Sequence, residues 1–107
     1  MKISIIVTTR FEGFHCWPAA PDEVAFLRNV HRHVFTVKAT IPVDHDDRDQ
    51  EFFIVRRMID ARIAEIQVSE HVESWSCERW ALALLEHFGF ESCEVWEDEE
   101  NGARVTR

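Results

Sequence analysis

The sequence predicts an α+β fold, in which a four-stranded antiparallel sheet carries two helices on one face. Two stretches near the start of the chain and two near its end are rich in β-branched and aromatic residues or alternate apolar and polar residues, as half-buried strands do. Between them, apolar residues recur at helical spacing in two segments. The order ββααββ lets both helices pack on the apolar face of the sheet.

The composition indicates a single domain covering residues 1–107. Of the 107 residues, 46% are hydrophobic, which is enough for one core. The formal net charge of -8 argues against binding to nucleic acid or to anionic lipid through a diffuse positive field. No apolar run is long enough to span a bilayer, and the first ten residues lack the features of a secretory signal. We therefore expect a soluble protein of the cytoplasm.

The first half of the chain predicts a long hairpin. Residues 2–15 contain no strand breaker before Gly13, and the odd positions share one face. Residues 16–30 contain two prolines and predict a loop with one short helical turn from Asp22. Residues 31–43 alternate along their whole length, which predicts a second strand with one buried face.

The middle of the chain predicts the two helices. An acidic tract at 44–51 has the composition of a solvated loop, and a helix follows over about 52–67. Ser74 or Ser76 can cap a second helix over about 76–88. The apolar positions that define the two helices are Phe52, Val55, Ile59, Ile63 and Ile66 in the first, and Cys77, Ala81, Leu84, Leu85 and Phe88 in the second.

The last segment predicts a second hairpin. Gly89 is expected to stop the preceding helix, residues 92–97 alternate again, and Asn101-Gly102 is a tight-turn signal that leads into a strand over 103–107. A sheet of only four strands leaves two edges without partners, a liability that proteins often relieve by pairing with other subunits. We therefore expect a homo-oligomer.

Three histidines predict a metal site. His31 and His33 lie two apart on a strand, so their side chains project from one face about 6.5 to 7 Å apart. That face continues with apolar residues, where an unpaired imidazole would be costly. Antiparallel pairing brings His15, at the end of the first strand, beside them, and three protein ligands suit a zinc ion with one open position. The alternative is three partly buried histidines that coordinate nothing.

Four segments, taken in order, resemble the family of 6-pyruvoyl- and 6-carboxy-tetrahydropterin synthases, which has the tunnelling fold. The segments are FEGFH at 11–15, HRHVF at 31–35, SCERWA at 76–81 and VWE at 95–97. The resemblance implies that His15, His31 and His33 bind Zn²⁺ and that active sites lie at subunit interfaces. It also implies trimers that close a β-barrel and stack as hexamers.

Glu97 is the expected substrate-binding residue. The resemblance implies that this glutamate anchors a pterin. Independently of the family, a carboxylate can accept two parallel hydrogen bonds from the amino-amide edge of a pterin or guanine. The alternative is a solvated residue at the start of the acidic run 97–100.

The sequence departs from the family at the catalytic base. The family cysteine falls at Leu27, which cannot accept a proton. In the family, an Asp-His pair activates this cysteine, and Glu70 and His71 are the best match to that pair here. Candidates for the base are Cys16, next to His15; Glu23, in the same loop as Leu27; and His71, oriented by Glu70. Arg10, Arg28, Arg32 and Arg48 are candidates for contacts to a triphosphate.

These observations support two hypotheses about function. The first is a zinc-dependent lyase that acts on 7,8-dihydroneopterin triphosphate or a related pterin, in queuosine and other 7-deazaguanine or pterin biosynthesis. The second is a binding module that retains zinc and a pterin or purine pocket but lacks the chemistry, with Leu27 as the mark of that loss. A structural assembly protein is a third reading.

Overall fold

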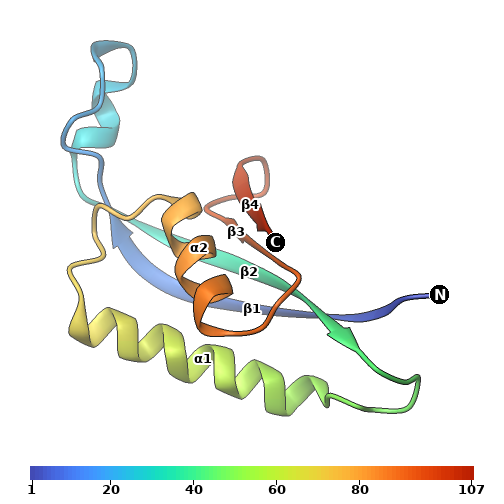
Figure 1. Cartoon of the computed structure of the whole chain (residues 1–107). Helices are drawn as coiled ribbons and strands as arrows, with labels where there is room; N and C mark the ends of the chain where they lie inside the picture. Colours follow the sequence, from blue (N-terminus) through green and yellow to red (C-terminus); the bar gives the residue numbers. More distant parts are fainter.

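The computed structural model describes residues 1–107 and confirms the predicted α+β order (Figure 1). A short 3₁₀ helix begins at Asp22, where the sequence predicts a helical turn. None of the helices has the length and apolar composition that crossing a membrane requires. The elements are β1 (Ile3–His15), η1 (Asp22–Arg28), β2 (His31–Val43), α1 (Phe52–Ser69), α2 (Cys77–His87), β3 (Ser92–Trp96) and β4 (Gly102–Thr106).

The sheet is antiparallel throughout, with its strands in the order β1-β2-β3-β4. β1 and β2 pair along their full length, from Ile3 opposite Val43 to His15 opposite His31. β3 pairs only with residues 36–40 of β2. One end of the long hairpin therefore extends beyond the other two strands and carries η1 at its tip (Figure 1).

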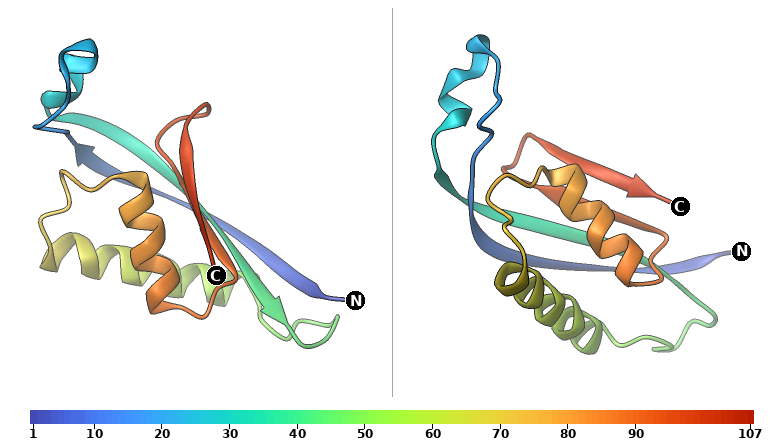
Figure 2. Two further views of the ribbon diagram at one scale, coloured as in Figure 1. Left: turned by 45° about the horizontal axis from the view of Figure 1, so that its top comes forward. Right: turned by 60° about the vertical axis from the view of Figure 1, so that its left-hand side comes forward.

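Both helices cover the same face of the sheet, as the sequence predicts (Figure 2). The core contains inward residues of all the first three strands and the apolar stripes of both helices. The inward residues include Val7 of β1, the alternate residues Phe35 to Ile41 of β2, and Cys93 and Val95 of β3; the helices contribute Val55, Ile59, Ile63 and Ile66 from α1 and Trp80, Ala81, Leu84 and Leu85 from α2.

The ends of α2 are fixed by side chains, one near in sequence and one distant. Ser76 is the N-cap, and its hydroxyl accepts a hydrogen bond from the backbone N–H of Arg79 at 3.0 Å. At the other end, Arg107 donates to the carbonyls of Leu85, Phe88 and Phe90 at 2.6–2.9 Å. Gly89, the expected stop, does not take a left-handed conformation. Arg107 instead satisfies carbonyls that the helix end exposes.

The β3–β4 connection differs from the expected tight turn. It runs from residue 97 to 101, and the Asp98 carboxylate accepts the backbone N–H groups of Glu100 and Asn101 at 2.8 and 2.6 Å. Neither Asn101 nor Gly102 has a positive φ. Gly102 lies opposite Trp96, and a Cβ on it would lie 2.5 Å from the indole ring. The glycine therefore makes room for a ring rather than for a turn.

Candidate metal centre and adjoining cavity

The three predicted histidines meet at the end of the long hairpin that is closed by the loop carrying η1. The register places His15 directly opposite His31, and His33 follows on the same face of β2. Their ring centroids lie 5.4 Å (His15–His31), 6.0 Å (His15–His33) and 4.5 Å (His31–His33) apart. One nitrogen from each ring lies within 4.8 Å of the other two. A tetrahedral zinc ion would set them about 3.4 Å apart, which small side-chain rotations can supply. The three residues are thus close enough to hold a metal ion.

Two hydrogen-bonding details also fit a metal. His31 Nδ1 lies 2.8 Å from the carbonyl oxygen of Asn29, so an Nδ1–H donated there leaves Nε2 free to ligate. His15 Nδ1 is shielded from solvent and has no hydrogen-bond partner. A bound ion would satisfy this nitrogen, which the protein alone leaves unpaired.

The electrostatic surroundings keep His15 neutral. Burial is the largest influence and lowers the pKa of His15. Glu97 raises that pKa, whereas the other two histidines lower it further, and the net shift is downward. A neutral imidazole is the form that binds a metal ion.

A cavity of about 590 Å³ adjoins the histidines. Four segments that are distant in sequence line it: the end of β1, the loop before β2, the start of α2 and the β3–β4 connection. Its size is within the range of small-molecule sites. Its lining residues are His15, Trp17, Leu27, Ser74, Trp75, Ser76, Cys77, Glu78, Arg79, Glu97, Asn101 and Gly102. His15 and Glu97, predicted to serve metal and substrate, therefore share one cavity.

The cavity contains a thiol, but at a different position from the family cysteine. Leu27 lines the wall, and the thiol of Cys77 lies at the start of α2. Burial, followed by the charges of Glu97 and Glu78, raises the pKa of Cys77 to about 12. The thiol is therefore protonated near neutral pH and is a poor base or nucleophile.

The four residues predicted for proton transfer do not line this cavity in the single chain. Cys16 is buried beside it, and its backbone N–H donates to the carbonyl of Glu73 at 2.7 Å. Glu23 is exposed on η1. Glu70 and His71 are both exposed, directly after α1.

The arginines predicted to contact a triphosphate lie elsewhere. Arg28 pairs with Asp22, and the guanidinium groups of Arg32 and Arg48 also pair with carboxylates. Arg10 makes no ion pair, but it lines a different hollow, with Lys38.

The arginine that does line the cavity, Arg79, was missed from the sequence. The sequence does contain a signal for it, because no acidic residue lies three or four positions before or after Arg79. The residues at those positions are Trp75, Ser76, Leu82 and Ala83. A helical arginine without a carboxylate at these spacings has no local ion-pair partner.

Comparison of the sequence with models of protein families and with curated proteins gave no match. Functional assignment therefore depends on the residues of the chain itself.

Proposed function

We propose that this protein is a zinc-dependent enzyme of the 6-carboxy- or 6-pyruvoyl-tetrahydropterin synthase type. Its substrate is 7,8-dihydroneopterin triphosphate or a related pterin. The observation that carries the proposal is the shared cavity: His15, one of three converging histidines, lines the same space as Glu97. The resemblance of four sequence segments to that family supports the same assignment.

The lining residues have complementary tasks in this proposal. The carboxylate of Glu97 accepts hydrogen bonds from the amino-amide edge of the pterin and so orients the ring. Trp17 offers aromatic surface to a planar ligand. His15, His31 and His33 hold Zn²⁺, which when bound supplies Lewis-acid polarisation of a substrate oxygen.

Proton transfer requires a group from outside the single-chain cavity. Leu27 cannot serve, and the Cys77 thiol is protonated. We propose that assembly as a trimer closing a β-barrel, or as a hexamer, brings the Glu70-His71 pair of one subunit to the cavity of another. Both residues are exposed and thus available for such a contact.

Turnover by the zinc-loaded protein tests the enzyme proposal. Incubation with 7,8-dihydroneopterin triphosphate should release triphosphate and form a new pterin, and chromatography measures both products. His33→Ala should abolish both zinc binding and turnover. His45→Ala, at an exposed histidine of the acidic loop, is the matched control and should retain both. Turnover that persists in His33→Ala, or none in the unaltered protein, would contradict the proposal.

A second function, ligand binding without turnover, is favoured by Leu27. This residue lines the cavity at the position where the resemblance implies a thiol, and His71 lies outside it. In this case pterins or guanine-like bases bind at the metal-loaded cavity and are recovered unchanged.

Calorimetry with neopterin and guanine tests this second function. Glu97→Gln should weaken binding by about 10- to 100-fold, because one charge-assisted pair of hydrogen bonds is lost. Glu99→Gln, at an exposed acid of the same loop, should bind as the unaltered protein does. Binding that is absent, or equal in the two variants, would rule out this function.

A further inference from the structure

Most arginines of the chain are already engaged. Six form ion pairs with carboxylates: Arg28, Arg32, Arg48, Arg56, Arg62 and Arg104. Arg107 donates to backbone carbonyls. The side chains of Arg10, Arg57 and Arg79 form neither an ion pair nor a hydrogen bond. Of these three, Arg79 alone lines the cavity that also contains His15 and Glu97.

An aromatic platform holds the Arg79 guanidinium. Its central carbon lies 4.8 Å from the ring centroid of Trp75, a cation–π contact. Trp75 packs in turn against buried Trp80, with 4.9 Å between ring centroids. A guanidinium stacked on a ring keeps its in-plane N–H donors free. Arg79 is therefore held in position while its hydrogen-bonding capacity is unused.

The charge of the cavity makes this arginine distinctive. Arg79 is the only lysine or arginine among the lining residues, which also include the carboxylates of Glu78 and Glu97. The guanidinium also borders a second hollow with Glu70 and Glu86, but neither carboxylate forms an ion pair with it. The chain has a net charge of -8, and Arg79 is the one cationic side chain available to an anionic ligand group in this cavity.

We infer that Arg79 recognises a phosphate group of the cavity's ligand and that Trp75 positions the guanidinium for this contact. The planar fork of an arginine matches phosphate oxygens in a bidentate arrangement. The inference rests on the proposed function for the pterin class of the ligand. It adds which side chain distinguishes the phosphorylated ligand from the same pterin without phosphate, namely Arg79 held by Trp75.

Calorimetry with a matched ligand pair tests this selection. The pair is neopterin triphosphate and neopterin, whose oxidised ring does not undergo the dihydropterin reaction. The zinc-loaded protein should prefer the triphosphate by about tenfold or more. Arg79→Gln should remove this preference and leave neopterin affinity unchanged. Arg79→Lys and Trp75→Leu should each retain part of it, whereas Arg57→Gln, at an unpaired arginine outside the cavity, should retain all of it.

Two results would overturn the inference: Arg79→Gln keeps the triphosphate preference, or it loses affinity for both ligands equally. Inorganic tripolyphosphate, titrated into metal-free protein to avoid zinc stripping, separates this failure from failure of the proposed function. Tripolyphosphate binding that depends on Arg79, with no neopterin binding, would overturn the pterin assignment and support the phosphate contact. Neopterin binding without any triphosphate preference would overturn only the role of Arg79. A lack of binding by all three probes would overturn both.

Discussion

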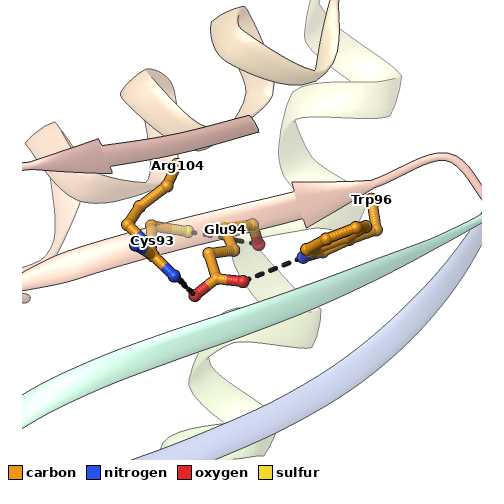
Figure 3. A network of polar contacts seen from close by, with 4 residues as sticks. All are labelled: Cys93, Glu94, Trp96 and Arg104. Atoms are coloured by element: carbon orange, nitrogen blue, oxygen red, sulfur yellow. Dashed lines mark hydrogen bonds and ion pairs between the residues drawn. The ribbon is translucent and has the colours of Figure 1, made fainter. Parts of the chain in front are cut away.

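At the scale of single residues, Glu94 is a buried carboxylate on the face of the sheet that the helices leave uncovered. One oxygen accepts the indole N–H of Trp96 at 2.9 Å, and the other accepts from Arg104 at 3.1 Å (Figure 3). Burial by itself would raise the pKa of Glu94, but these two hydrogen bonds, with the charges of Arg104 and Lys38, lower it overall. The ionised form therefore contributes to stability.

Glu94→Gln should destabilise the protein by about 1–2 kcal/mol at about pH 7, because a charge-assisted contact with Arg104 is lost. The folded pKa is below the ordinary value of 4.5, so this contribution is present above pH 4.5 and is lost as pH falls through the folded pKa. Urea unfolding at about pH 7 and about pH 3.5 should show a smaller difference from the unaltered protein in acid. An equal difference at both pH values, or a similar loss in the exposed control Glu86→Gln, would contradict this account.

The proximity of the three histidines could be predicted from the sequence, whereas for Arg79 the sequence indicates only the lack of a local ion-pair partner and not its place in the fold. Side chains on a strand alternate between its two faces, so His31 and His33 share a face. Antiparallel pairing of β1 with β2 then brings His15 beside them. The exposure of Glu23 and His71 and the placement of Arg79 depend on tertiary packing. Arg79 in particular is positioned by Trp75, whose ring orientation is set by its contact with Trp80.

Removal of metal provides a second test at this scale. Zinc at about 100 times its dissociation constant would stabilise the folded chain by about 2.7 kcal/mol, which corresponds to about 10 to 20 °C in Tm. Thermal unfolding with zinc and after chelation should show this shift. In His33→Ala the two curves should coincide, and a shift that remains in this variant would place the metal elsewhere.

At the scale of elements, alternation and helical spacing predicted the strands and helices well, but one boundary depends on a distant residue and another on a side chain within the connection itself. α2 ends at His87, where Arg107 takes up the carbonyls, and not through a left-handed Gly89. The β3–β4 connection is longer than the Asn-Gly signal indicates, because Asp98 accepts its backbone N–H groups. The local pattern of α2 carries no information about Arg107, which lies 22 residues beyond Leu85.

Arg107→Gln should lower the free energy of unfolding by about 1–3 kcal/mol, since the carbonyls of Leu85 and Phe88 at the end of α2 and that of Phe90 just after it lose a cationic donor. Urea denaturation measures the change. Arg57→Gln, at an exposed arginine of α1, should change it by less than about 0.5 kcal/mol. Equal effects of the two substitutions would show that Arg107 has no special part in ending the helix.

At the scale of the whole molecule, the sheet ends in edge strands on both sides, β1 and β4. The uncovered face of the hairpin also exposes the large apolar side chains of Ile6, Phe14 and Val34. Unpaired edges and exposed apolar surface are relieved when subunits join. These features support the proposed barrel of three subunits or its stacked hexamer.

Sedimentation equilibrium should therefore give a mass of three or six chains of 12.6 kDa. The expected reason is edge-to-edge pairing between β1 and β4 of neighbouring subunits. A single 12.6 kDa species at micromolar concentration would remove the basis for a site shared between subunits. It would leave the metal centre intact, because one chain supplies all three histidines.

The close approach of Trp96 to Gly102 limits which substitutions these two positions can accept during evolution. Any side chain at position 102 would collide with the indole, so a change there is tolerated only after the ring has become smaller. The two positions should therefore change together, with the substitution of Trp96 first. Trp96→Ala should accordingly permit Gly102→Ala. Since position 102 borders the cavity, such a paired exchange would also reshape the space available to a ligand.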